Sequence, residues 1–184
     1  MPHTVRSVIR CLAVSLVLLA ATMSSGCGYS LAGRGSFLPS YIRTIGVPMF
    51  VNNTPVFDVE RTITDRVRSE LIGRGRYKVE TERVGVDAVL TGEILNIALA
   101  ASAFNQQQQA TRYAITIVAR IEFRDVKTDK VLWQNPAMAF TEQYDVTTVV
   151  APDAAAFLGQ NTNAVERLAS EFARTIVSAI LEAF

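Results

Sequence analysis

The chain of 184 residues contains few of the residue types on which enzyme and metal sites depend. Its one histidine is His3 and its two cysteines are Cys11 and Cys27, all near the start. Cleavage before Cys27 would leave no histidine and no second thiol, which excludes Ser-His-Asp hydrolysis, disulfides and zinc sites built from Cys and His. The sequence also has no Gly-x-Gly-x-x-Gly, no Walker-type Gly-Lys-Ser/Thr and no EF-hand spacing, so nucleotide and calcium sites have no support.

The chain also has no large excess of either positive or negative charge. Lys and Arg number 18 against 17 Asp and Glu, a net charge of +1, and apolar residues make up 49% of the chain. This composition fits a folded chain and predicts no nucleic-acid partner held by overall charge. The longest uncharged apolar run, from Cys11 to Met23, is short of the roughly 20 residues that a membrane-spanning helix needs.

The N-terminus has the layout of a bacterial secretory signal. Arg6 and Arg10 precede the apolar run, and Ser-Ser-Gly-Cys at 24–27 follows it. This ending resembles the lipobox of bacterial lipoproteins, where the cysteine thiol takes a diacylglyceryl group and becomes the mature N-terminus. The alternative is an ordinary signal with a chance cysteine. We predict a signal peptide at 1–26, a lipidated N-terminus and flexible tether at 27–40, and a single domain at 41–184.

The rest of the chain alternates between strand and helix signals. β-forming residues at 42–51 predict a strand, and Thr54–Pro55 predicts a helix start. Further strands are expected at 76–82, 88–100, 112–124 and 131–144, of which 112–124 has the clearest period of two and 131–144 contains Pro136, suggesting an edge position or a bulge. Apolar stripes predict two helices: Val59, Ile63, Val67 and Leu71, ending at Gly73, and Val165, Leu168, Phe172, Ile176 and Ile180.

Two helices with one apolar face each need a sheet to cover. We therefore expect an α+β fold, a two-layer sandwich in which two helices pack on one face of a mainly antiparallel four- to five-stranded sheet, in the order β-α-β-β-β-β-α.

Several short motifs occur along this order of elements: Cys27-Gly28-Tyr29, Leu71-Ile72-Gly73-Arg74-Gly75, Ala88-Val89-Leu90-Thr91-Gly92, Ala103-Phe104-Asn105, and Asp125 through Val131-Leu132-Trp133. Together they resemble the LptE family of lipopolysaccharide-assembly outer-membrane lipoproteins. The resemblance implies a periplasm-facing, lipid-anchored protein that is not an enzyme and has no cofactor beyond the lipid on Cys27. It also implies a partner, the LptD β-barrel translocon, whose assembly it assists and which it plugs, and contact with lipopolysaccharide during insertion at the cell surface. Gly28, where an Asp commonly retains a lipoprotein in the inner membrane, favours the outer membrane.

Two groups of basic residues are candidate contacts to lipopolysaccharide or another anion. The first follows the first helix, and the second lies on the polar face of the strand at 112–124; they are Arg74, Arg76 and Lys78, and Arg112, Arg120 and Arg124. Each group has a simpler interpretation: a solvated face near a helix end, or a sheet face balanced by Glu93, Glu122 and Glu142.

A third surface is a loop between two strands. Phe104, Asn105, Gln106 and Gln107 form a candidate partner-docking loop, although such amides can also simply stay hydrated. Trp133 is expected in the core rather than as a sugar-stacking surface. Two other functions stay open: a lipid-anchored periplasmic accessory protein for a cell-wall synthase or secretion channel, and a hydrolase that uses only carboxylates, with candidates Glu93, Glu122, Glu142 and Asp145.

Overall fold

Three long antiparallel strands form the centre of the fold in the computed structural model, which describes residues 38–145 and 153–183. They are β4 (Ala88–Phe104), β5 (Ala110–Asp125) and β6 (Val131–Asp145), with β5 in the middle. All three predicted strands are confirmed, and each is longer than its sequence pattern indicates. Two consecutive hairpins therefore build most of the sheet.

Three short strands lie on the other side of β4 and run parallel to their neighbours. β1 (Thr44–Gly46) pairs with both β3 (Lys78–Glu80) and β4, and β2 (Val51–Asn52) pairs further along β4. The α+β class is confirmed, and the long strands are antiparallel as predicted, but the short parallel strands make the sheet in the described part mixed and six-stranded rather than four- to five-stranded. The parallel pairing follows from the strand–helix–strand order, because the intervening helix returns the chain to the same end of the sheet.

The predicted strand at 42–51 is divided into β1 and β2. Pro48 lies between them and has no N–H to give to the ladder. The buried Phe50 donates its N–H to the hydroxyl of Thr64 in the first helix, at 3.0 Å. Its ring lies against β4 at Gly92, where a Cβ would stand 2.3 Å from the ring atoms. The absence of a side chain at Gly92 therefore leaves room for the Phe50 ring to pack against β4.

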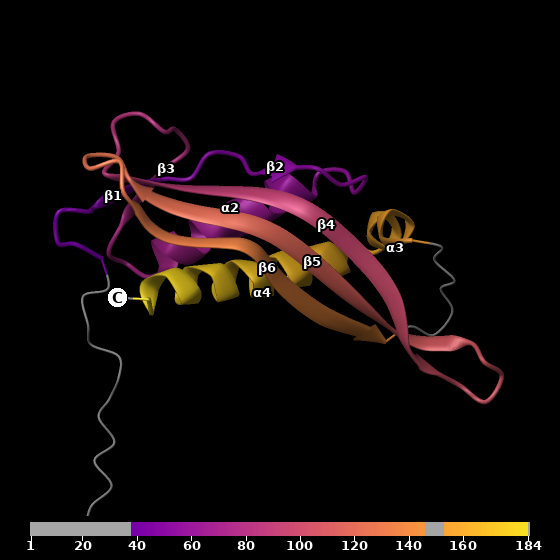
Figure 1. Cartoon of the computed structure of the whole chain (residues 1–184). Helices are drawn as coiled ribbons and strands as arrows, with labels where there is room; N and C mark the ends of the chain where they lie inside the picture. Colours follow the sequence, from indigo (N-terminus) through magenta and orange to yellow (C-terminus); the bar gives the residue numbers. More distant parts are fainter. Residues whose placement is uncertain (1–37, 146–152, 184) are drawn as a thin grey trace, which may run out of the picture. The chain divides into compact units, whose positions relative to one another are not determined.

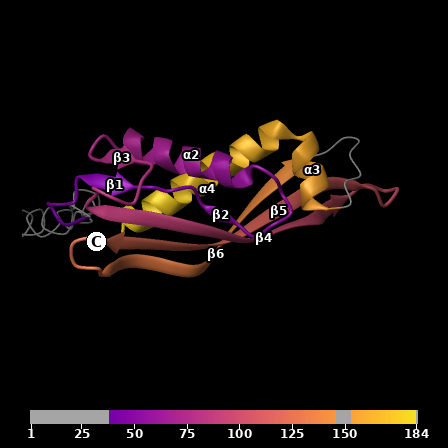
Figure 2. The same ribbon diagram turned by 90° about the horizontal axis from the view of Figure 1, so that it is seen from above.

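Two helices, α2 (Val59–Gly73) and α4 (Thr162–Leu181), cover one face of the sheet and pack against each other (Figures 1 and 2). Their buried side chains include the predicted stripes except Val165, which is half-buried against the core, and the β5 residues on the same face are buried with them. In the helices these are Val59, Ile63, Val67, Leu71, Leu168, Phe172, Ile176 and Ile180. On β5 they are Tyr113, Ile115, Ile117, Ala119, Ile121 and Phe123. The two-layer arrangement is confirmed.

A third helix, α3 (Ala154–Gln160), precedes α4 and was not predicted. Its seven residues are too few to show a helical stripe. The Asp153 side chain caps it by accepting a hydrogen bond from a backbone N–H of the first turn at 2.8 Å. The ring of Phe157 packs against Tyr113 and Tyr144, with centroids 5.7 and 5.9 Å apart. This helix therefore extends the core toward the far ends of β5 and β6.

The start of α2 differs from the prediction. Thr54 does not cap the helix, because its N–H and hydroxyl both donate to the Asn52 side-chain oxygen, at 2.9 and 2.8 Å. The helix begins only at Val59, after Asp58 in a left-handed conformation with φ of 64°. The predicted end at Gly73 is confirmed.

Pro136 occupies the position that the sequence predicted. It lies in the edge strand β6, where the pairing with β5 shifts register between Ala119 and Ile121. The side-chain oxygen of Asn135 accepts the backbone N–H of Ala137 at 3.1 Å beside it. The missing N–H of the proline is thus placed at an irregularity of an edge strand.

Candidate functional site

The face of the sheet turned away from the helices carries the predicted cationic row of β5. Alternating positions place its three arginines on this face, beside acidic residues of β4, β5 and β6. Each guanidinium binds a carboxylate: Arg112 with Asp145 at 2.6 Å, Arg120 with Glu93, and Arg124 with Glu122 at 2.9 Å. An anionic ligand on this face would have to compete with these carboxylates.

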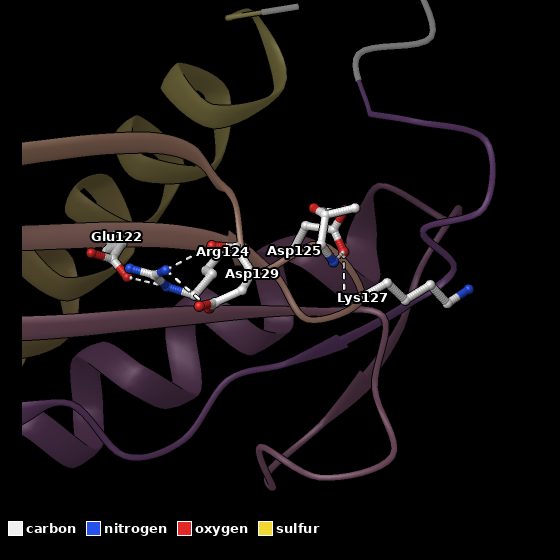
Figure 3. Close-up of polar contacts among 6 residues, drawn as sticks. Glu122, Arg124, Asp125, Lys127 and Asp129 are labelled. Carbon is white, nitrogen blue, oxygen red and sulfur yellow. Dashed lines mark hydrogen bonds and ion pairs between the residues drawn. The ribbon is translucent and has the colours of Figure 1, made fainter.

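Arg124 has two carboxylate partners (Figure 3). Its guanidinium lies between Glu122 and Asp129, and donates to the backbone and side-chain oxygens of Asp129 at 2.9 and 3.1 Å. The hydrogen bonds to Glu122 and then to Asp129 raise the pKa of Arg124 above its ordinary value. Arg124 therefore stabilises the β5–β6 hairpin.

Asp125, the next residue, joins this hairpin to the start of the domain. Its buried carboxylate accepts hydrogen bonds from the Tyr41 hydroxyl, the Thr128 hydroxyl at 2.8 Å and the Lys127 N–H at 2.8 Å. Figure 3 shows the contact between Asp125 and Lys127. The bond from Tyr41, helped by the others, lowers the pKa of Asp125 below its ordinary value, although burial acts against it. Asp87 is held similarly: two backbone N–H groups at the start of β1, each at 3.0 Å, lower its pKa.

The four carboxylates considered for acid–base chemistry are all bound to arginines. Glu93, Glu122 and Asp145 hold the β5 row, and Glu142 binds Arg167 of α4 at 3.2 Å. Carboxylate-based hydrolysis uses one protonated and one ionised carboxyl group across a cleft. Each of these four carboxylates instead has an arginine as its partner.

The second candidate group lies where α2 ends and β3 begins. Arg74 binds Glu70 at 2.8 Å and Lys78 binds Glu80 at 2.7 Å. Arg76 has no carboxylate partner among the described residues. Of the six predicted cationic contacts, Arg76 is thus the one whose charge is unpaired within the part of the chain that the structure describes.

The structure brings a further cation, Arg43, beside this group, although it was not predicted. Thr44 pairs with Lys78 in the parallel β1–β3 ladder, and the Lys78 N–H donates to the Arg43 carbonyl at 2.8 Å. Arg43, Arg76 and Lys78 line one open pocket of about 500 Å³. The strand–helix–strand order contained the needed signal, because it makes the starts of the first two predicted strands neighbours.

The predicted docking loop is an ordered turn at the tip of the β4–β5 hairpin, which extends past the helices in Figure 1. The Asn105 side-chain oxygen accepts the N–H groups of Gln107 and Gln109, at 3.0 and 2.9 Å. Asn105 therefore holds the turn, and its amide oxygen is used inside the loop. Phe104 is 58% exposed, and the side chains of Gln106 and Gln107 are exposed as well.

The remaining expectations lie elsewhere in the chain. Trp133 is half-buried and packs against the core, as predicted. Cys27, the segment 1–26 and most of the tether 27–40 lie outside the described residues. Within 38–145 and 153–183, no group of three His, Cys, Asp or Glu side chains is arranged to bind a metal ion. No helix in that part of the chain is long and apolar enough to cross a membrane.

These features define a class of protein: an α+β domain whose sheet is covered by helices on one face, carries paired charges on the other face, and ends in a hairpin that extends past the helices. The chain belongs to the LptE family, described as lipopolysaccharide-assembly, whose family model matches residues 42–180. It is a family of non-enzymatic lipoproteins of the cell envelope. The resemblance seen in the short motifs is confirmed.

Solved structures share the fold at low sequence identity. The hypothetical protein CT253 from Chlamydia trachomatis has a TM-score of 0.51 and 10% identity, over 76% of this chain and 96% of that chain. A PelC dodecamer from Paraburkholderia phytofirmans (TM-score 0.49, 13% identity, 78% and 92% covered) and a minor lipoprotein from Acinetobacter baumannii (0.47, 10%, 78% and 93%) are also similar. At these identities the first likeness shows the fold alone. No match was found among curated proteins.

Proposed function

We propose that this protein is an outer-membrane lipoprotein, anchored by lipid on Cys27 and facing the periplasm, that partners an LptD-type β-barrel. In this role it assists assembly of the barrel, plugs it, and helps lipopolysaccharide to insert at the cell surface. The proposal includes the domain boundaries 1–26, 27–40 and 41–184. The observation that carries it is the LptE family match over residues 42–180, which covers nearly all of the folded domain.

The β4–β5 hairpin supports the partnership as the docking element. Its turn is fixed by Asn105, so an exposed Phe104 is presented at a defined place rather than on a mobile loop. Ordered exposed aromatic side chains are frequent anchors of protein interfaces. We therefore place the barrel contact at Phe104, Gln106 and Gln107, with Asn105 positioning them.

The experiment that tests the partnership is co-purification from detergent-solubilised membranes through a C-terminal tag. We expect mass spectrometry to identify a large outer-membrane β-barrel and a triacylated Cys27. Recovery of a penicillin-binding protein or a secretin instead of a barrel would support the alternative, an accessory protein for a cell-wall synthase or secretion channel. The matched control is the untagged chain taken through the same steps.

The lipopolysaccharide contact is proposed at the two cationic groups. The first lies on the open sheet face, which is the face turned away from the helices, and consists of Arg112, Arg120 and Arg124. The second lies where α2 ends and β3 begins and consists of Arg74, Arg76 and Lys78. The double variant Arg120→Gln/Glu93→Gln removes one charge pair of the open face without changing the net charge. We expect weaker lipopolysaccharide binding with little loss of stability, since exposed pairs contribute only about 0–1 kcal/mol.

The matched control for this contact is Arg167→Gln/Glu142→Gln, which removes a pair between β6 and α4. Binding of lipopolysaccharide is measured by titrating each purified variant. Equal binding by the first double variant and the native chain would mean that the open face does not contact the glycolipid.

A further inference from the structure

A pocket of about 500 Å³ lies between the first described residues, the start of β1 and the start of β3. This volume is within the range of about 300–1,000 Å³ in which small ligands bind. Its polar lining consists of Ser40, Arg43, Arg76, Tyr77 and Lys78. The residues come from two separate segments, 38–43 and 76–78, and the parallel β1–β3 pairing holds them together.

The charge in this pocket is of one sign. Three cationic residues line it and no acidic residue does. Lys78 is paired with Glu80 at 2.7 Å, whereas the side chains of Arg43 and Arg76 have no partner in the part of the chain that the structure describes. Two guanidiniums without counterions in one concave site attract an anion.

Two hydroxyl groups add neutral hydrogen-bond donors to the same pocket. Those of Ser40 and Tyr77 have no hydrogen-bond partner among the described residues. Burial raises the pKa of Tyr77, and the charge of Arg76 acts in the opposite direction, as it does when a guanidinium lies near the phenol. No buried side-chain nitrogen or oxygen in the described residues lacks a partner, so these free donors face the solvent.

We propose that this pocket binds a phosphate group, with Arg43 and Arg76 as its charged ligands and Ser40, Tyr77 and Lys78 as additional donors. A phosphate offers several oxygens to several donors at once and suits the flat, multiply donating guanidinium. The pocket shares Arg76 and Lys78 with the contacts proposed above, adds Ser40, Arg43 and Tyr77, and needs neither the barrel nor lipopolysaccharide.

The place of the pocket indicates where the phosphate comes from. Leu38, eleven residues after Cys27, lies at its edge, and eleven residues span at most about 40 Å. With the lipid anchor proposed at Cys27, the pocket lies within reach of the membrane surface. A phospholipid headgroup bound there would orient the domain on its membrane, whereas free phosphate would only fill the pocket.

The test measures binding by the purified full-length chain in dodecyl maltoside micelles with isothermal titration calorimetry. One arm uses inorganic phosphate and the other uses phosphatidylglycerol added to the micelles. We expect the double variant Arg43→Gln/Arg76→Gln to weaken binding by about tenfold or more. Tyr77→Phe, which keeps the packing and removes one donor, should weaken it less.

The matched control is Arg61→Gln/Arg174→Gln, which removes two exposed guanidiniums elsewhere, from pairs with Asp58 and Glu171. A phospholipid headgroup is supported if the native chain binds only in the phosphatidylglycerol arm, and if Arg43→Gln/Arg76→Gln loses this binding while the control variant keeps it. Binding of inorganic phosphate with the same pattern supports a pocket for free phosphate. Equal losses in both double variants, or no binding by the native chain, would overturn the proposal. Thermal unfolding of each variant checks that the fold is retained.

Discussion

At the scale of single residues, Gly92 makes a close contact that no other residue type allows. The ring of Phe50 would stand 2.3 Å from a Cβ at this position, and Phe50 is buried in the core. We expect Gly92→Ala to lower the free energy of unfolding by about 1–3 kcal/mol, because the ring must move out of a packed site. Gly159→Ala, where nothing lies within 4 Å, is the control and should change it by less than about 1 kcal/mol. Urea unfolding of both variants would measure this, and equal stabilities would contradict the contact.

Asp125 is the residue at which a pH dependence is expected. Its pKa is lowered in the folded state, so the unfolded chain binds more protons than the native one at acid pH. The resulting stabilisation is present above the ordinary carboxyl pKa of about 3.9 and is lost as the pH falls through the lowered native value. Asp125→Asn should lower the melting temperature at neutral pH by several degrees, because the single amide oxygen cannot accept from all four donors that face the carboxylate.

The same variant should lose stability less steeply than the native chain when both are acidified. Melting temperatures from pH 7 down to pH 2 give this slope. Asp65→Asn is the control, because Asp65 is exposed on α2 and lies away from the hairpin. If Asp125→Asn and the native chain showed identical acid slopes, Asp125 would not be a source of the acid sensitivity.

At the scale of elements, the β4–β5 hairpin is an extension whose tip contributes little to the core. Phe104 is 58% exposed, so Phe104→Ser should leave the melting temperature nearly unchanged. We expect the same variant to recover much less β-barrel in co-purification. Phe57→Ser, at an exposed phenylalanine before α2, is the matched control and should recover the native amount. Undiminished recovery with Phe104→Ser would place the docking surface elsewhere.

The long elements were predictable from the sequence over nearly their full extent, whereas the short ones were predictable only in part. β5 alternates apolar residues with mostly polar ones along most of its length, and α2 and α4 show stripes that are confirmed by burial. The predicted strands at 42–51 and 76–82 contain β1 and β3, but the strands themselves have only three residues each. α3 was not predicted, because its seven residues are too few to show a helical stripe.

The candidate site was predictable by residue type but not by its pairings. Alternation placed Arg120 on the polar face of β5, and Glu93 was expected among the acids that balance this face, yet the register that pairs the two strands is in no local pattern. Arg43 was missed for the same reason, because only the parallel β1–β3 pairing brings it beside Lys78. The contacts between distant segments are therefore the part of the site that could not be predicted from local sequence patterns.

At the scale of the whole molecule, charge is balanced on the open sheet face and unbalanced at one end of the domain. The β5 arginines are paired, whereas Arg43 and Arg76 have no carboxylate partner among the described residues. The end that carries them is also the end at which the chain enters the domain. A lipid anchor at Cys27 would hold this end near the membrane and raise the local concentration of the domain beside a membrane partner.

The anchor can be tested separately from its destination. Cys27→Ala removes the proposed lipidation site, and we expect the protein to leave the membrane fraction and to recover far less barrel. Gly28→Asp keeps the cysteine but introduces the residue that commonly retains lipoproteins in the inner membrane. This variant should stay lipidated, move to the inner-membrane fraction and also lose the barrel. Membrane fractionation with mass spectrometry of the N-terminus distinguishes the two. If Cys27→Ala still fractionated with the outer membrane at the native level, the lipid would not be what holds the domain there. If Gly28→Asp recovered as much barrel as the native chain, pairing with the barrel would not depend on residue 28.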